Sequence, residues 1–284
     1  MVNPSTRNAP AGLFQVGQRP AFGTYLAETW RRRAFAFWLA SSRMTSDLMQ
    51  NRLGILWLIL KPLSMVLVYG TIFTFVLSGA ARPVNFLPYL VIGVFVFEFF
   101  TGCFGSGSKA ITSNSKLVQS LGFPRILLPI AVVIEQSLKM VPIIVLLYVL
   151  LIALGQPIMW TWLLLVPILV LMAIFNLGVA LIVARLSAHV RDVQQVVPII
   201  TRVLFYATGI FFNVEGALEG HPVLLGIVQW LPTYDFVSLA RDVLLTTYSA
   251  PAVAWIAAPV WAVLALMFGT IYFWRAEARY GLSD

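Results

Sequence analysis

Long apolar runs separated by short polar connections make up most of this chain. Six of them come close to the length of about 20 residues that a helix needs to cross the hydrocarbon core of a membrane. They cover residues 53–78, 86–105, 126–155, 157–186, 194–213 and 251–274. The third and fourth contain Pro142 and Pro167, which predicts tilt or kinks there. The pattern predicts an all-α membrane protein with six transmembrane helices.

Two other segments are only partly apolar. In residues 21–52, aromatic and leucine side chains alternate with arginines, which predicts an amphipathic helix in the lipid headgroup layer; a solvated helix is the alternative. In residues 214–247, Pro222, Pro232 and several carboxylates interrupt the apolar sequence. We interpret this segment as two short re-entrant helices in the outer leaflet, with two additional full spans as the alternative. Residues 1–20 are polar and Pro-rich, and predict a disordered cytoplasmic leader ahead of a transmembrane domain over 53–284.

Composition supports a membrane protein, and charge orients it. The 284 residues are 60% hydrophobic and 11% charged, against about 25% charged in soluble domains. By the positive-inside rule, the side richer in lysine and arginine is cytoplasmic. That side holds Arg7, Arg19, Arg31, Arg32, Arg33, Arg43, Arg52, Lys61, Lys109, Lys116, Arg125, Arg185, Arg191, Arg275 and Arg279. Only Arg82 and Arg241 fall outside, so both termini are predicted to be cytoplasmic, in the plasma (inner) membrane. Topology thus explains the net charge of +8, and no nucleic acid partner is expected.

The polar run over residues 106–122 and the Phe-Pro-Arg-Ile-Leu-Leu-Pro sequence at 123–129 stand out between two apolar runs. They predict a short helix along the cytoplasmic membrane face, where an outside protein can push. Its start can be capped by Ser113, Asn114 and Ser115. Its apolar face would consist of Leu117, Val118 and Leu121. Its positive side would carry Lys109, Lys116 and Arg125.

Catalytic chemistry is poorly supported. The Gly-rich sequence at 102–109 lacks the adjacent Gly-Lys-Ser/Thr of a phosphate-binding loop, since Ser108 separates Gly107 from Lys109 and an apolar run precedes it. His189 and His221 fall on opposite sides of the membrane, and the outer carboxylates are not spaced as metal ligands. We predict no catalytic residue, no metal and no nucleotide site on this chain.

Several charged residues lie inside apolar runs. Glu135 and Lys139 are four residues apart, so they share a helix face and can neutralise each other; a proton or ion path is the alternative. Glu98 and Arg202 can meet between the second and fifth runs, or Glu98 can face a polar passage. Aromatic rings that could line such a passage and stack on sugars are Trp57, Tyr69, Phe73, Tyr206 and Phe212. Contact of these rings with lipid or with other helices is the alternative.

Three sequence segments together resemble the membrane subunit of ABC-2-type polysaccharide and polyol-phosphate exporters. They are residues 51–63, residues 114–129 and the Arg191-Asp192-Val193 triplet, in the family's order and spacing. Lys61 departs from the acidic or neutral residue that is commoner there. Thr208-Gly209-Ile210 replaces the usual Ser-Pro-Ile, and Leu231-Pro232-Thr233 stands where Asn-Pro-Leu/Phe is usual. The last two departures concern the predicted outer gate.

The resemblance implies a permease that moves a polyprenyl-diphosphate-linked glycan, of cell-wall galactan or O-antigen type. A second copy of the chain and two nucleotide-binding subunits carrying ATP and Mg²⁺ would be its partners. Coupling to the ATPase would involve Lys109, Asn114, Lys116, Leu117, Phe123, Pro124, Arg125, Arg191 and Asp192. The lipid-diphosphate entrance would use Arg31, Arg32, Arg33, Arg43 and Arg52. The outer gate would contain Pro232, Tyr234, Asp235 and Arg241. Alternatives are an exporter of drugs or small lipids and a membrane-bound glycosyl- or phosphotransferase.

Overall fold

The computed structural model describes residues 21–50, 54, 56–76, 83–120 and 123–277. All regular structure in these ranges is helical, which confirms the predicted all-α class. The helices are α1 (Phe22–Arg31), α2 (Arg33–Gln50), α3 (Leu56–Val76), α4 (Phe86–Ser108), α5 (Ser115–Ser120), α6 (Leu127–Ala153), α7 (Leu165–His189), α8 (Val193–Ala207), α9 (Val214–Ala217), α10 (Pro222–Gln229), α11 (Pro232–Leu244) and α12 (Ala254–Trp274). Two 3-10 turns, η2 (Thr112–Asn114) and η3 (Trp160–Leu164), precede α5 and α7.

Five of the described helical segments are long and apolar enough to span a membrane: α3, α4, α6, η3 with α7, and α12. The predicted fifth span is shorter than expected, because α8 ends at Ala207 and Gly209 then turns the chain with φ +64°. A helix of its 15 residues is about 22 Å long, less than the hydrocarbon core of about 30 Å. A sixth candidate span is the pair α10 and α11, which is bent by 81°.

The segment after α8 consists of three short helices, α9 to α11. Pro222 and Pro232 lie in the first turns of α10 and α11, where a missing N–H costs no helical hydrogen bond. With 8 and 13 residues, neither helix spans a membrane alone, so the alternative of two additional full spans is wrong. Most of α11 is buried against α4, α7 and α12, whereas α10 buries none of its residues.

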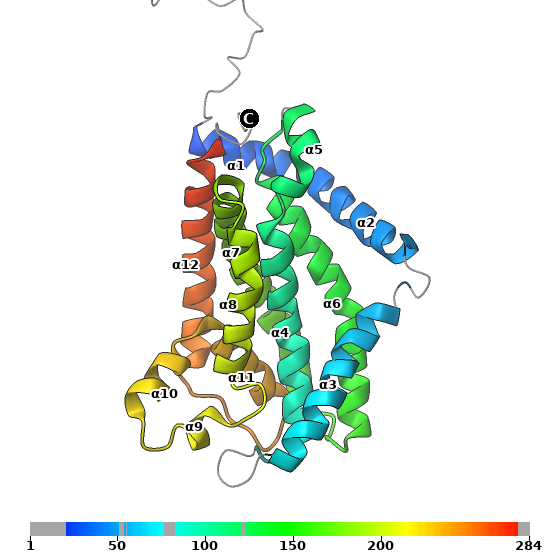
Figure 1. Ribbon diagram of the computed structural model, residues 1–284, viewed down its shortest axis with the longest axis vertical. Coiled ribbons are helices and arrows are strands. Elements are labelled where there is room, and N and C mark those ends of the chain that lie inside the picture. Colours follow the sequence, from blue (N-terminus) through cyan, green and yellow to red (C-terminus); the bar gives the residue numbers. More distant parts are fainter. Residues whose placement is uncertain (1–20, 51–53, 55, 77–82, 121–122, 278–284) are drawn as a thin grey trace, which may run out of the picture.

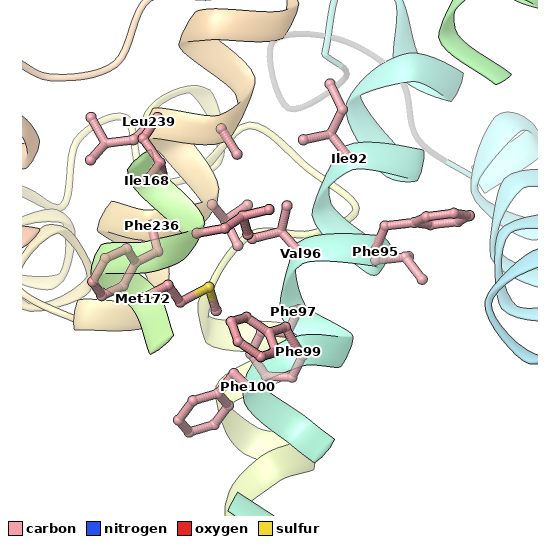
Figure 2. Close-up of a cluster of buried hydrophobic side chains, with 14 of the residues drawn as sticks. Ile92, Phe95, Val96, Phe97, Phe99, Phe100, Ile168, Met172, Phe236 and Leu239 are labelled. Atoms are coloured by element: carbon pink, nitrogen blue, oxygen red, sulfur yellow. The ribbon is translucent and has the colours of Figure 1, made fainter. Parts of the chain in front are cut away.

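Helix α4 is the centre of the bundle, with α3, α6, α7, α8 and α11 packed around it (Figure 1). Of its span, 78% is buried, against 11% for the span on α3. Figure 2 shows the core between α4, α7 and α11, where Phe97 and Phe100 of α4 approach Met172 of α7 and Phe236 of α11. Each such ring buries a large apolar area.

A second buried cluster lies at the end of the bundle that carries α1 and α5 (Figure 1). The predicted amphipathic stretch is divided at Arg32 into α1 and α2, and α2 packs against α6. Tyr25 of α1 and Ala36 and Ala40 of α2 are buried there, while Trp30 and Trp38 are exposed. The two helices thus pack one apolar face against the bundle, and the aromatic rings of their other face are exposed. The predicted leader, residues 1–20, lies outside the described residues.

Candidate functional site

The predicted coupling segment connects α4 to α6. Helix α4 continues to Ser108, so the first part of the polar run is transmembrane helix rather than connection. The hydroxyl of Ser113 donates to the Lys109 carbonyl at 2.6 Å, and the Asn114 amide donates to the Ala110 carbonyl at 2.7 Å. These side chains therefore close the end of α4 instead of capping α5. Leu117 and Val118 form the inner face of α5, as predicted. Leu121, the third residue of the predicted face, lies outside the described residues.

The predicted coupling segment and the loop between α7 and α8 are joined directly. The Gln194 side-chain amide donates to the Thr112 hydroxyl at 2.8 Å. Lys109, Arg191 and Asp192 are exposed. Both predicted docking segments therefore present charged side chains from one continuous end of the bundle. Of the other predicted coupling residues, Lys116 lies on α5.

The Phe-Pro-Arg sequence is an anchor rather than an exposed surface. Phe123 and Pro124 are buried, and the ring of Phe123 lies 5.3 Å from that of Phe35 on α2. The Arg125 backbone N–H donates to the Glu277 carboxylate at 2.9 Å, and its guanidinium donates to the Glu277 carbonyl at 2.7 Å. The same carboxylate accepts a hydrogen bond of 2.8 Å from the Tyr25 hydroxyl. Burial raises the pKa of the Glu277 carboxyl, and the hydrogen bonds from Arg125 and Tyr25 oppose that shift.

Sequence reasoning missed Glu277 and Tyr25. The available signal was Glu277 itself, an acidic residue between Arg275 and Arg279 just after the last apolar run. A carboxylate in such a basic segment is expected to form an ion pair, although the sequence does not indicate with which residue.

The predicted entrance arginines occupy different environments. Arg31 and Arg33 border an open hollow of about 560 Å³ at the junction of α1 and α2, together with Phe37 and Trp38. Arg32 instead pairs with Glu28 at 2.8 Å. Both arginines of this hollow are exposed. The Arg33 guanidinium donates to the Trp30 carbonyl at 3.1 Å and lies over the Trp30 ring.

Arg43 is separated from that hollow. Its guanidinium donates to the Asn114 side-chain carbonyl at 2.8 Å, which links α2 to the turn before α5. Burial lowers the pKa of Arg43, and the nearby carboxylates of Glu135 and Asp47 oppose this shift. Arg52, the fifth predicted entrance residue, lies outside the described residues.

Three of the five predicted passage residues border hollows between the helices. Tyr69 and Tyr206 lie in one hollow of about 330 Å³ between α3, α4 and α8, and Trp57 lies in another of about 380 Å³ between α3, α4 and α6. Phe73 is stacked on Phe211 at 4.6 Å. The backbone carbonyl of Phe212 accepts a hydrogen bond of 3.0 Å from Tyr89. The last two residues are thus engaged in packing between α3, α4 and the end of α8.

Three charged residues within the bundle, Glu98, Glu135 and Lys139, form ion pairs, and one of these pairings differs from expectation. Lys139 binds Glu135 at 2.6 Å, which confirms the predicted pair, and it also binds Asp47 of α2 at 2.9 Å. Glu98 pairs with Lys61 of α3. The predicted contact between Glu98 and Arg202 is therefore replaced by one with Lys61, although Arg202 borders the same hollow.

The predicted outer-gate residues lie inside the bundle on α11. Pro232 begins the helix, and Tyr234, Asp235 and Arg241 are buried. The guanidinium carbon of Arg241 lies 3.4 Å from the ring centre of Tyr89, and its Nη2 donates to the Ile210 carbonyl at 3.2 Å. Arg241 thus holds α11 against α4 and the chain that follows α8.

The two sequence departures near the predicted gate contact each other. The hydroxyl oxygens of Thr208 and Thr233 are 2.8 Å apart and buried. A buried hydroxyl needs a hydrogen-bond partner, so a threonine at one position favours a threonine at the other. This contact joins the end of α8 to the start of α11.

A family model described as ABC-2 type transporter matches residues 35–245. The chain belongs to the ABC-2 type transporter family. The O-antigen export system permease protein RfbA of Myxococcus xanthus is 29% identical over 188 residues, 65% of this chain and 70% of that protein. RfbA of Klebsiella pneumoniae is 26% identical over 65% of this chain and 68% of its own length. The polysialic acid transport protein KpsM of Escherichia coli is 26% identical over 80% and 88%.

These comparisons confirm the resemblance inferred from the three sequence segments. The ABC-2 match runs from Phe35 on α2 to Leu245 after α11, and so contains the predicted coupling segment, the two hollows beside α3 and the buried Arg241. The ABC-2 relatives are named as permease and transport proteins rather than as enzymes. Within the described residues, no three His, Cys, Asp or Glu side chains come together as a metal site.

Proposed function

We propose that this chain is the permease subunit of an ABC exporter for a polyprenyl-diphosphate-linked polysaccharide, a cell-wall galactan or an O-antigen-type glycan. The observation that carries the proposal is its similarity to O-antigen and polysialic acid transport proteins over 65% and 80% of the chain. ATP and Mg²⁺ would be held by two separate nucleotide-binding subunits. Two copies of the permease would face each other around the passage, in the plasma membrane.

The end of the bundle with α1 and α5 would face the cytoplasm. Basic residues favour that side of a membrane, and this end carries Arg31, Arg32, Arg33, Lys109, Arg125, Arg185, Arg191 and Arg275. The first and last described helices meet at this end, which supports the cytoplasmic placement of both termini (Figure 1).

The surface that receives the ATPase would be formed by Lys109, Arg191 and Asp192. These side chains are exposed, and the hydrogen bond from Gln194 to Thr112 makes their two segments neighbours. A displacement imposed on this surface would change the arrangement of the helices that continue from it, α4, α6, α7 and α8. A two-state rearrangement of this kind is how a nucleotide-driven motion reaches a distant passage.

The substrate path would start at the α1–α2 hollow. Arg31 and Arg33 are suited to a diphosphate because guanidinium groups bind phosphate oxygens in a bidentate manner. Tyr69 and Tyr206 border a hollow that combines aromatic rings with polar groups. This combination suits a sugar, because the apolar face of the sugar ring can stack on an aromatic ring while its hydroxyl groups bond to the polar groups. The glycan would pass along α3 and α8.

Reconstitution with the ATP-binding subunit tests this function. The permease and its partner ABC ATPase would be purified as a complex and inserted into liposomes with a labelled polyprenyl-diphosphate glycan. ATP should drive transfer of the glycan across the bilayer, and a complex whose ATPase cannot hydrolyse ATP should transfer none. ATPase activity that responds to amphiphilic drugs and not to the glycan would instead indicate a drug exporter. Glycosyl transfer by the permease alone, sensitive to chelators, would contradict the proposal.

A further inference from the structure

A single buried carboxylate joins three parts of the chain that are far apart in sequence. Glu277 follows α12, Tyr25 lies on α1, and Arg125 precedes α6. The carboxylate oxygens accept from the Tyr25 hydroxyl at 2.8 Å and from the Arg125 backbone N–H at 2.9 Å. Only 7% of the Glu277 side chain is exposed. Charge-assisted hydrogen bonds in such a site are strong and directional.

The Arg125 side chain completes this contact. Its guanidinium donates to the Glu277 carbonyl at 2.7 Å and lies 3.8 Å from the carboxylate. The aromatic contact between Phe22 of α1 and Trp274 of α12, with ring centres 5.2 Å apart, lies beside it. Helix α1 is therefore fixed to both the end of α12 and the Phe-Pro-Arg anchor through Glu277.

A second contact fixes the other helix of the amphipathic pair. Arg43 of α2 donates to Asn114, which itself donates back to the Ala110 carbonyl at the end of α4. The coupling segment is thus linked to α1 through Glu277 and is hydrogen-bonded directly to α2 through Asn114. The hollow with Arg31 and Arg33 lies at the α1–α2 junction, between these two attachments.

We propose that Glu277 is a positioning residue that makes α1 and the coupling segment move as one body. Binding of an anionic lipid head at the α1–α2 hollow would then change the affinity for the ATPase subunit, and the ATPase would change the affinity for the lipid by the same factor. The effect of lipid binding on the affinity for the ATPase is the regulatory part of this inference, and it rests on the proposed function. The joint movement of α1 and the coupling segment is the mechanical part, and it concerns this chain alone.

The mechanical part is tested by spin labels on α1 and on the coupling segment, at Ala27→Cys and Ser115→Cys. Both positions are exposed, and the native Cys103 is buried. In the permease alone in nanodiscs, the distance distribution between the labels should be narrow. It should broaden with Tyr25→Phe, which keeps the ring, and with Glu277→Gln, which removes the charge. Tyr248→Phe, which removes a hydroxyl at the opposite end, should have no effect. An unchanged distribution in both variants overturns the proposal.

The regulatory part is tested in the complex with the ATPase. Tyr25→Phe and Glu277→Gln should leave basal ATP hydrolysis unchanged and reduce its stimulation by the polyprenyl-diphosphate glycan by about fivefold or more, within the usual range of coupling between sites. Stimulation equal to wild type in both variants overturns this part. If the wild-type complex shows no stimulation or export, the proposed function fails, whereas the label distances still decide the mechanical part.

Discussion

The ammonium group of Lys61 on α3 pairs with the carboxylate of Glu98 on α4, and both side chains border two hollows of the bundle. The pair lies where the hollow against α6 meets the hollow against α8. Charged side chains at membrane depth usually face a cavity or a partner. Lys61 and Glu98 face the hollows and also pair with each other. Lys61 is also one of the positions at which this chain departs from the family pattern, so its pairing explains how the departure is tolerated.

Breaking this pair should destabilise the bundle. Lys61→Met leaves Glu98 without its partner in a largely apolar environment. We expect a loss of about 1 kcal/mol, below the 3–5 kcal/mol for fully buried pairs, because 57% of the Lys61 side chain is exposed. The double variant Lys61→Met, Glu98→Gln should recover most of the loss. Denaturant unfolding in detergent measures both, and a double variant less stable than the single one would contradict the pairing.

Asp192 is a better residue than Arg125 for testing attachment of the ATPase. Asp192→Lys reverses an exposed charge on the proposed docking surface, and should weaken complex formation by about tenfold, because the ATPase surface would complement the native charge. Pull-down of the ATPase at rising salt measures the effect, with membrane insertion as a check on folding. Glu219→Lys, an exposed reversal near α9 and α10, is the matched control. Equal loss in both variants would exclude a specific contact.

Charge reversal at Arg125 is not a clean test of the same surface. Arg125→Glu would place two carboxylates together at Glu277, inside the second buried cluster. Like charges in a buried site cost stability, so this variant is expected to fold poorly rather than to lose ATPase contact alone.

The arginines of the α1–α2 junction should differ in their effect on substrate. Arg31→Gln and Arg33→Gln should each lower the apparent affinity for a polyprenyl diphosphate by about tenfold, the lower end of the value of one charge-assisted hydrogen bond. Arg32→Gln should have a smaller effect because Arg32 engages Glu28. The concentration of lipid that half-stimulates the ATPase measures this. The same loss in all three single variants would indicate a general effect of charge.

Much of the fold could be predicted because apolar length and basic residues are local signals. The five long spans, the amphipathic α1–α2 segment and the Glu135–Lys139 pair all follow from spacing along one helix. The position of the coupling segment followed from a polar run between two spans. Its apolar face followed from helical periodicity at Leu117 and Val118.

The remaining features depend on contacts between distant segments. Nothing local indicates that Glu98 meets Lys61 rather than Arg202, since all three face the space around α4. The early end of α8 is set by the positive φ of Gly209, which leaves a helix too short to span. Tyr25 and Glu277 are 252 residues apart, and only the tertiary structure brings them together.

The close packing of α7 and α12 depends on two glycines. A Cβ atom added at Gly178 would collide with the backbone of Ala265, and one at Gly269 would collide with the backbone of Gly178. Backbone atoms cannot move aside as a flexible side chain can, so the two helices would have to separate. Small residues at such a contact are how helices approach closely within membranes.

Gly178→Ala should therefore destabilise the bundle by about 1–3 kcal/mol, the range for overpacking a core. Gly105→Ala on α4 is the matched control, because a Cβ there meets nothing within 4 Å. Its alanine should be neutral or stabilise by up to about 1 kcal/mol through helix propensity alone. Thermal unfolding of the two variants in the same detergent gives the comparison. A Gly178→Ala variant as stable as Gly105→Ala would mean that α7 and α12 are held apart more widely than in this structure.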